Sequence, residues 1–191
     1  MADFSAVFFD RDGTLNLDPG YLGDPEKVVL YPGVSEALLS LKSRAFKIVV
    51  ISNQSGIARG YFTEKEVDAV NLKINELLKA SGVFVDAFYY CPYHPDFNTP
   101  EECRCRKPSP ELVFKAARDL DIALPKSYFV GDMISDVECG INAGLKTVLL
   151  KNTLKEEQIS GLLVKDRLPN FIADNLIDAA DFIIKDFSGG N

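Results

Sequence analysis

The segment AVFFDRDGT, residues 6–14, decides the fold of this chain. Its first four residues are apolar, which predicts a short buried β-strand over residues 6–9. The strand leads directly into a polar turn, DRDGT, which carries two carboxylates and a glycine. Polar residues that follow a buried strand in this way are typical of parallel sheets, in which functional groups collect at the carboxyl ends of the strands.

Further strands and helices alternate along the rest of the chain. Short apolar runs predict strands over residues 46–51, 87–90, 128–130, 147–150 and 171–173. Amphipathic stretches predict helices over residues 35–44, 63–79, 110–120, 136–143 and 175–184, the second of which begins at a Thr63–Glu66 capping box. Residues 151–165 receive no assignment, and residues 188–191 are expected to fray. The alternation predicts a three-layer α/β fold, a doubly wound parallel sheet with helices on both faces.

Length, composition and charge narrow the class of protein. The 191 residues are 47% hydrophobic and 26% charged, which fits a single globular domain over residues 1–191. The formal net charge of −7, without a long basic run, argues against nucleic-acid binding. No apolar run reaches the roughly 18 residues of a membrane span, and no signal peptide is recognisable. We therefore expect a cytoplasmic protein, and we expect it to be a monomer.

The residues that follow the predicted strands share one chemistry. They are carboxylates, a hydroxyl and an amine: Asp10 and Asp12, Ser52, Lys107, and Asp132 with Asp136. Neighbouring carboxylates repel one another unless a cation lies between them, and oxygen ligands of this kind suit Mg²⁺. The lysine, the hydroxyl and the backbone N–H groups after it can hold phosphate oxygens. The set predicts phosphoryl transfer, in which positioning and charge neutralisation supply most of the acceleration.

These elements also carry a family resemblance. The segment DRDGT at residues 10–14, Ser52, Lys107 and the Gly131-Asp132 pair match, in order, the four motifs of the haloacid dehalogenase superfamily. The resemblance covers about residues 6–150 and implies the Rossmann-like core of that superfamily. It implies that Asp10 attacks phosphorus and forms an aspartyl-phosphate, while Asp12 protonates the leaving oxygen and later activates water. The short interval between Asp12 and Ser52 leaves no room for a separate cap domain.

The same resemblance assigns ligands around the reacting phosphorus. Mg²⁺ is expected on the Asp10 carboxylate, the Asp12 main-chain carbonyl and Asp132. Asp136 is expected to orient a metal-bound water or the Lys107 side chain, and a helix cap is its alternative role. The residues expected to bind the transferring phosphoryl group are Ser52, the Asn53 amide and Lys107.

A cluster of cysteines lies in the loop over residues 91–108. Its members Cys91, His94, Cys103 and Cys105 provide three thiolates and one imidazole, a complete ligand set for a structural Zn²⁺. Free thiols beside a surface histidine are the alternative. Cys139, on a predicted helix, is interpreted as a small buried apolar residue. A zinc loop at this place resembles the branch of the superfamily that contains heptose bisphosphate and histidinol phosphatases, although that branch usually has its histidine where this chain has Tyr93.

The loops beside the motifs favour one substrate of that branch. Residues 53–62, which include Gln54 and Ser55, resemble the heptose enzymes. Residues expected to contact substrate there are Asp18, Pro19, Gly20, Tyr21, Asn53, Gln54 and Ser55. Arg106 offers a planar fork to a hydroxyl or a remote phosphate, with a loop-stabilising role as the alternative. Met133 stands where those enzymes commonly have a basic residue. The expected substrate is D-glycero-D-manno-heptose 1,7-bisphosphate, with histidinol phosphate or another small phosphometabolite as the alternative.

Two non-enzymatic classes make different predictions. A phosphosugar-binding protein without catalysis should lack the nucleophile, the acid or a metal ligand, and this chain has all of them. A zinc-knuckle nucleic-acid module should carry a basic, aromatic surface, which the acidic composition does not supply. We therefore predict a Mg²⁺-dependent phosphatase with a structural Zn²⁺ and a small phosphorylated substrate.

Overall fold

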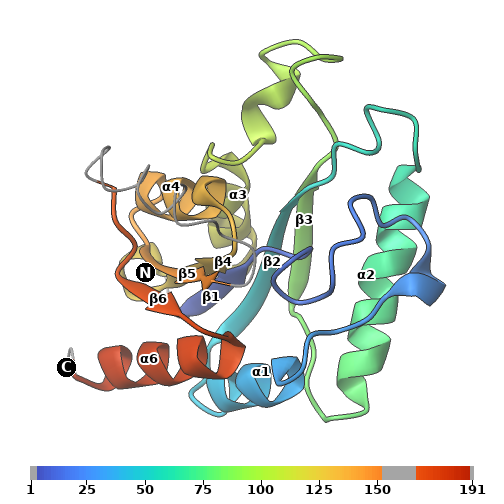
Figure 1. Ribbon diagram of the computed structural model, residues 1–191. Coiled ribbons are helices and arrows are strands. Elements are labelled where there is room, and N and C mark those ends of the chain that lie inside the picture. The colour runs from blue at the N-terminus through green and yellow to red at the C-terminus, as the bar shows by residue number, and fades with distance from the viewer. Residues whose placement is uncertain (1–3, 152–166, 190–191) are drawn as a thin grey trace.

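The strands of the computed structural model form one parallel sheet in the order β3-β2-β1-β4-β5-β6 (Figure 1). The structure describes residues 4–151 and 167–189. Its strands are β1 (Ala6–Phe9), β2 (Lys47–Asn53), β3 (Ala87–Cys91), β4 (Tyr128–Gly131), β5 (Lys146–Leu150) and β6 (Phe171–Ala173). The bounds of these strands agree with the predicted ones to within about two residues, which is the usual precision of an element's ends.

Helices cover both faces of this sheet. They are α1 (Val34–Lys42), α2 (Glu64–Lys79), α3 (Glu111–Leu120), α4 (Ile134–Asn142) and α6 (Leu176–Gly189), with 3₁₀ helices η1 (Pro25–Lys27), η2 (Glu102–Cys105) and η3 (Leu124–Lys126). Helices α1, α2 and α6 pack one apolar cluster against the sheet, and α3 and α4 pack a second cluster against the opposite face (Figure 1). The predicted three-layer α/β architecture is therefore confirmed.

The central strand β1 shows why the sheet is covered on both sides. Val7 and Phe9 belong to the cluster under α1, α2 and α6. Ala6 and Phe8 belong to the cluster under α3 and α4. Each of these four side chains is at most 1% exposed, and burying one phenylalanine contributes roughly 1.5–3 kcal/mol. The strand is thus held by apolar packing on both faces, as expected for a parallel sheet.

The register of the sheet places the predicted functional residues at one edge. Phe9, the last residue of β1, lies opposite Val50 of β2 and Val130 of β4. The polar turn after β1 therefore lies beside the carboxyl ends of both neighbouring strands. The chain runs from β1 to β2 and β3 on one side, and it returns to β4 on the other. This edge is the topological switch point at which α/β proteins bind ligands.

Helix α2 begins as predicted, at a reciprocal cap. The Thr63 hydroxyl accepts a hydrogen bond from Glu66 N at 3.4 Å, and the Glu66 carboxylate accepts one from Thr63 N at 2.6 Å. This geometry confirms the capping box. The buried residues of the helix include Val67, Val70 and Ile74, so α2 is fixed both at its first turn and along its apolar face.

Helix α4 begins earlier than predicted, at Ile134 rather than at Asp136. The Asp136 carboxylate accepts a hydrogen bond from Met133 N at 2.9 Å. The capping side chain, Asp136, therefore belongs to the first turn of α4 instead of preceding the helix. Asp136 does cap this helix, and its second oxygen stays available for contacts within the fold.

The C-terminal part of the chain also differs from its prediction. Helix α6 continues to Gly189, so the expected fraying does not begin at Ser188. The stretch over residues 151–165, which received no assignment, lies outside the described residues apart from Lys151. Across the described ranges, the structure contains no helix with the length and apolar character needed to cross a membrane.

The segment between β1 and α1 contains one short helical element. Its described residues 10–33 include η1, which packs against α2. An ion pair joins the same two elements, with Lys73 Nζ 3.8 Å from Glu26 Oε1. Within residues 10–33 the structure therefore forms no separate cap domain, in agreement with the prediction.

Candidate active site

A cavity of about 300 Å³ opens at the carboxyl edge of the sheet. Twelve of the predicted site residues line it: Asp10, Asp12, Asp18, Gly20, Tyr21, Asn53, Gln54, Ser55, Arg106, Lys107, Asp132 and Asp136. Two that were expected to contact substrate, Pro19 and Ser52, do not line it. Apolar side chains of Leu22, Phe62 and Met133 also line it. The structure thus brings most of the predicted residues to one concave site.

Three buried carboxylates form the centre of this site. Asp10, Asp132 and Asp136 each contribute one oxygen, and these atoms all lie within 4.8 Å of one another. Burial raises the pKa of Asp10 to about 7, and burial also raises the pKa of Asp136. In the part of the chain that the structure describes, no other group of potential metal ligands is so arranged. Carboxylates held this closely favour a bound cation, which restores their ionised form.

Gly13 lets the turn after β1 approach these carboxylates. Its φ is +84°, and a Cβ at this position would come 2.4 Å from Asp132 Oδ2. The next residue holds the same carboxylate, because the Thr14 hydroxyl donates a hydrogen bond to Asp132 Oδ1 at 3.3 Å. The DRDGT turn therefore both leaves space for Asp132 and keeps it in place.

Lys107 is the cation of the cluster. Its Nζ lies 2.6 Å from Asp10 Oδ1 and 2.7 Å from Asp136 Oδ1. It also donates a hydrogen bond to Ile51 O at 2.9 Å. Burial alone would lower the pKa of this amine, but the charges of Asp10 and Asp136 outweigh burial and raise it. Lys107 therefore stays protonated, and one ammonium group cannot balance three carboxylates.

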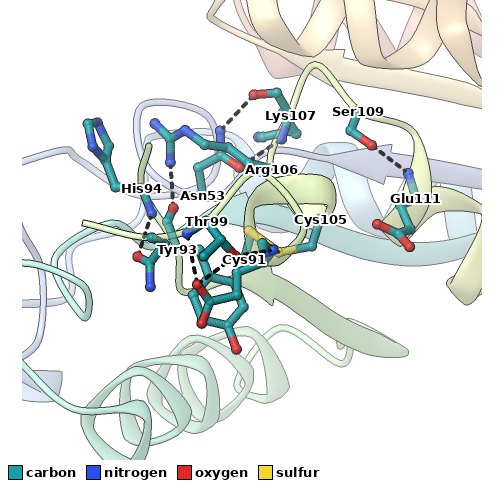
Figure 2. Close-up of a disulfide and its surroundings, with 12 residues drawn as sticks. Asn53, Cys91, Tyr93, His94, Thr99, Cys105, Arg106, Lys107, Ser109 and Glu111 are labelled. Atoms are coloured by element: carbon teal, nitrogen blue, oxygen red, sulfur yellow. Dashed lines mark hydrogen bonds between the residues drawn. A yellow bond between two sulfur atoms is a disulfide. The ribbon is translucent and has the colours of Figure 1, made fainter. Parts of the chain in front are cut away.

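The last residue of β2, Asn53, holds the backbone of Lys107 by hydrogen bonds. Asn53 Oδ1 accepts a hydrogen bond from Lys107 N at 3.0 Å, and Asn53 Nδ2 donates one to Lys107 O at 3.3 Å. The Asn53 side chain thus holds the lysine backbone (Figure 2). Ser52 is only 3% exposed, and its hydroxyl accepts a hydrogen bond from Gln54 Nε2 at 3.3 Å. Ser52 does not line the cavity in this structure.

Asp12 is surrounded by hydrogen-bond donors. Arg11 Nη2 and Gln54 Nε2 each donate to Asp12 Oδ2 at 2.9 Å. Asn16 Nδ2 donates to Asp12 Oδ1 at 2.9 Å. The Asp12 side chain is 21% exposed, so one side of the carboxylate faces the cavity while the others are held by the protein. This placement suits a group that exchanges a proton with a bound molecule.

Comparisons with known proteins agree with this geometry. A family model described as HAD-hyrolase-like matches residues 104–179. The D-glycero-D-manno-heptose-1,7-bisphosphate 7-phosphatase of Chlorobaculum tepidum is 40% identical over 188 residues, which cover 94% of this chain and 94% of that protein. This chain is a haloacid dehalogenase superfamily phosphatase.

Two further proteins place the phosphatase within its superfamily. The D-glycero-beta-D-manno-heptose-1,7-bisphosphate 7-phosphatase of Escherichia coli is 37% identical over 172 residues, which cover 88% of this chain and 90% of that protein. The solved structure of D,D-heptose 1.7-bisphosphate phosphatase from B. bronchiseptica, complexed with magnesium and phosphate, matches with a TM-score of 0.82. It is 28% identical and covers 96% of this chain and 99% of that one. The predicted superfamily and branch are confirmed.

The carboxylate cluster of the phosphatase fits the magnesium ion that its superfamily implies. The cluster offers only carboxylate oxygens, the hard ligands that Mg²⁺ prefers. Asp132 is 3% exposed and Asp136 is 1% exposed, so the cluster is shielded from bulk water.

The cysteine loop of the phosphatase differs from the predicted zinc set. Cys91, at the end of β3, and Cys105, in η2, form a disulfide with their Cα atoms 5.3 Å apart (Figure 2). Cys103 is free. The His94 ring contacts Arg59 and Asp96. A disulfide sulfur has no thiolate to give to a metal, so the four predicted ligands do not form a zinc site here.

The path of the loop explains this difference. Residues 91–105 fold back so that η2 returns to the end of β3, a contact that the spacing of the cysteines does not reveal.

Cys139 lies outside this loop. It is free and buried, as predicted, and burial raises the pKa of its thiol to about 12.

Three further residues of the phosphatase belong to the site although their roles were not predicted. They are Arg11, Asn16 and Asn71, which connect to Asp12 directly or through one another. Arg11 had a recognisable signal, because a charged residue two positions after a buried strand must find a partner if it is buried. Asn71 had none, since it lies 60 positions away from Arg11 in the sequence.

Proposed function

We propose that this chain removes the 7-phosphate of D-glycero-D-manno-heptose 1,7-bisphosphate through an aspartyl-phosphate on Asp10. The observation that carries the proposal is the position of Asp10, buried beside Lys107 and two more carboxylates in a cavity at the switch point of the sheet. Relatives that are 35–40% identical over most of the chain are named for this activity, which supports the choice of substrate.

The proposed reaction has two steps. First, an Asp10 oxygen attacks phosphorus, the bond between phosphorus and the sugar oxygen breaks, and Asp12 gives a proton to that oxygen. Second, a water molecule gives a proton to Asp12 and attacks the same phosphorus. The bond to Asp10 then breaks and inorganic phosphate leaves, so both aspartates return to their starting states.

The charged neighbours of Asp10 support these steps. Lys107 contacts Asp10 and would neutralise charge on the phosphoryl oxygens as the new bond forms. Asp136 contacts the lysine at 2.7 Å, which supports a role in orienting it. Mg²⁺ would be held by Asp10, Asp132 and the main-chain carbonyl of Asp12. When bound, it supplies further positive charge to the phosphoryl group.

The mouth of the cavity carries the groups proposed to bind the sugar. Asp18, Gly20, Tyr21 and Arg106 all line the cavity. Tyr21 is 48% exposed and makes an edge-to-face contact with Tyr61, with ring centroids 4.7 Å apart. We propose that Arg106 binds a sugar hydroxyl or the second phosphate, because its fork matches such oxygens.

Phosphate release from two substrates tests the proposed function. The purified protein with Mg²⁺ should release phosphate from D-glycero-D-manno-heptose 1,7-bisphosphate much faster than from histidinol phosphate under the same conditions. The product should be the 1-phosphate of the sugar. A preference for histidinol phosphate, or no release from either compound, would contradict the proposal.

We also propose that the reduced loop binds Zn²⁺ through Cys91, His94, Cys103 and Cys105. The return of η2 to the end of β3 supports this, because it brings two of the thiols together. Protein purified with reductant should contain about one zinc per chain, and oxidised protein should contain none. His94→Ala should lower the zinc content of the reduced protein. Unchanged zinc in that variant would exclude the histidine from the set.

We further propose that residues 1–191 act as one domain and as a monomer. The single continuous sheet, with apolar clusters on both of its faces, supports one domain. Light scattering during gel filtration should give the mass of one chain. A mass of two chains would contradict the monomer.

A further inference from the structure

Arg11 is a fully buried arginine beside the proposed acid–base residue. It is 0% exposed and is the largest fully buried side chain among the described residues. Two nitrogens of its guanidinium donate hydrogen bonds to the Asp12 carboxylate. Nε lies 3.2 Å from each Asp12 oxygen, and Nη2 lies 2.9 Å from Oδ2. A buried arginine of this kind needs partners for its charge and its N–H groups. Its main partner is therefore the carboxylate of Asp12.

Two neutral amides complete the surroundings of the guanidinium. Arg11 Nη2 donates to Gln54 Oε1 at 3.1 Å, and Arg11 Nη1 donates to Asn71 Oδ1 at 3.1 Å. Gln54 also donates to Asp12, so it bridges the acid and the arginine. Asn71 is different, because it contacts Arg11 and does not line the cavity.

Helix α2 gives Asn71 a fixed position. Asn71 is 7% exposed and lies one position after Val70, which is buried against the sheet. The capping box at Thr63 fixes the start of the same helix. The hydrogen bond that Arg11 donates to Asn71 therefore ties Arg11 to a helix rather than to a loop, and Arg11 in turn holds Asp12.

We infer that Arg11 is the positioning residue for Asp12 and that Asn71 sets the position of Arg11. The inference rests on the proposed function, in which Asp12 gives a proton to the leaving oxygen. Such a donor must lie within hydrogen-bond reach of that oxygen. A fork on the inner side of the carboxylate leaves its open side directed at the cavity. No contact between substrate and Arg11 or Asn71 is required.

The chemistry of the leaving group separates positioning from general support of the fold. A sugar alkoxide is a poor leaving group and needs the proton of Asp12 during the first step. The p-nitrophenolate of p-nitrophenyl phosphate is stable as an anion and leaves without one. A displaced Asp12 should therefore slow the release of the first equivalent of sugar 1-phosphate and leave the release of the first equivalent of p-nitrophenol nearly unchanged, because these products form in the first step.

Asn71→Ala is the main variant for this test, and Asn75→Ala is its matched control. Asn75 lies one turn further along α2, and its amide bonds to the backbone of Val85 instead of to Arg11. Rapid-quench measurements would give the first-turnover rate of each protein, measured as release of the first equivalent of sugar 1-phosphate from D-glycero-D-manno-heptose 1,7-bisphosphate and of p-nitrophenol from p-nitrophenyl phosphate. Thermal unfolding would show how much stability each variant has lost.

Asn71→Ala is expected to slow the first turnover of the sugar substrate by about tenfold, with less than about a twofold change for the aryl substrate. Asn75→Ala should leave the ratio of the two rates at its wild-type value. Arg11→Lys keeps a positive charge but loses the fork, so it should change the ratio in the same direction and by more. If Arg11→Lys does not fold, the ratio measured for Asn71→Ala is sufficient to test the inference.

An unchanged ratio in Asn71→Ala would overturn the inference, even if both rates fell. An equal change of the ratio in Asn75→Ala would overturn it as well, because loosening of α2 would then explain the effect. If the wild-type protein hydrolyses neither substrate, the proposed function fails, and this inference falls with it. If the wild type is active and only the ratio test fails, the inference alone is wrong.

Discussion

Both edges of the sheet pair a lysine with carboxylate oxygens, but the two edges differ in their balance of charge. At the carboxyl edge, Lys107 faces Asp10 and Asp136, and Asp132 lies within the same group. At the amino edge, Lys146 Nζ and the Tyr128 hydroxyl both lie 2.5 Å from one carboxylate oxygen. That oxygen belongs to Asp186 of α6. One edge has more acid than base, and the other is balanced.

The pKa shifts follow the same division. Burial raises the pKa of Asp10 to about 7 because a single lysine cannot offset the loss of water and the nearby carboxylates. Burial would also raise the pKa of Asp186, but hydrogen bonds from Lys146 and Tyr128 outweigh it and lower that pKa. Buried carboxylates whose charge is not offset by nearby cations mark the edge of the sheet at which we expect the reaction to occur. A compensated carboxylate only holds elements together.

The largest effect is expected from removing the proposed nucleophile at the carboxyl edge. Asp10→Asn should lower phosphate release by about 10³-fold or more, because an amide does not attack phosphorus. The fold should persist, since the change removes a buried charge. Asp121→Asn is the control. Asp121 ends α3 in the left-handed conformation, which asparagine also adopts readily, so this variant should keep its turnover. Substantial turnover in Asp10→Asn would break the comparison.

A smaller effect is expected when the packing of the same edge is changed without removing any acid. Gly13→Ala should lower turnover by about 10²-fold, because its Cβ would displace Asp132 and misplace the metal ligands. Gly82→Ala is the matched control, since its φ of +75° imposes the same backbone strain with no atom within 4 Å of the new Cβ. That variant should lose about 1 kcal/mol of stability and no activity. Equal losses of activity in both variants would show that strain, not close approach, is responsible.

The disulfide loop beside the carboxyl edge gives a third effect, on stability rather than chemistry. Cys105→Ser should lower the free energy of unfolding by about 3 kcal/mol or less, because it releases a short closed loop in the unfolded chain. Thermal unfolding with a metal chelator present would measure this. Added reductant should remove the difference from wild type, and Cys103→Ser should show no difference, since Cys103 is free. Equal stability of Cys105→Ser and wild type without reductant would exclude the disulfide.

The smallest effect is expected at the amino edge, and it should depend on pH. The folded pKa of Asp186 is lowered, so its contribution is present above the ordinary aspartate pKa of about 3.9. It is lost as the pH falls through the folded value. Asp186→Asn should cost at most about 1 kcal/mol at neutral pH and leave turnover unchanged. The difference from wild type should vanish in acid.

Asp181→Asn, on the exposed side of the same helix, is the control for Asp186. It should have the stability of the wild type at neutral pH, because an exposed substitution changes few contacts. A loss of turnover in Asp186→Asn would break the distinction between the two edges. A stability difference from wild type that grows as the pH falls would contradict the sign of the shift.

The sequence predicts the fold and the centre of the site because both depend on local patterns. The apolar run over residues 6–9 predicts β1, and the turn that follows must then lie at the edge of the sheet. Thr63 and Glu66 predict the start of α2 for a similarly local reason, since both halves of the capping box lie within one helical turn. The convergence of Asp10, Lys107 and Asp132 follows from the topology once the strands are known to be parallel.

Contacts between distant segments are what the sequence does not predict. The bond between Arg11 and Asn71 joins the first loop to the middle of a helix, and no local pattern marks the asparagine. The disulfide between Cys91 and Cys105 depends on how an irregular loop folds back. The place of Ser52 was also not predicted, because β2 continues through it and its hydroxyl accepts a hydrogen bond from Gln54 without lining the cavity.

The register of β1 makes the polar centre depend on apolar neighbours. Phe9 lies level with Val50 and Val130, and alternate side chains of a strand point to opposite faces. A slip of one residue would send Phe9 to the wrong face of the sheet and carry Asp10 away from Lys107. A substitution at Phe8 or Phe9 can therefore abolish phosphatase activity, although both side chains are buried in the core and neither lines the cavity. A screen of variants for lost phosphatase activity would therefore find substitutions at these aromatic core residues as well as at the acidic residues of the site.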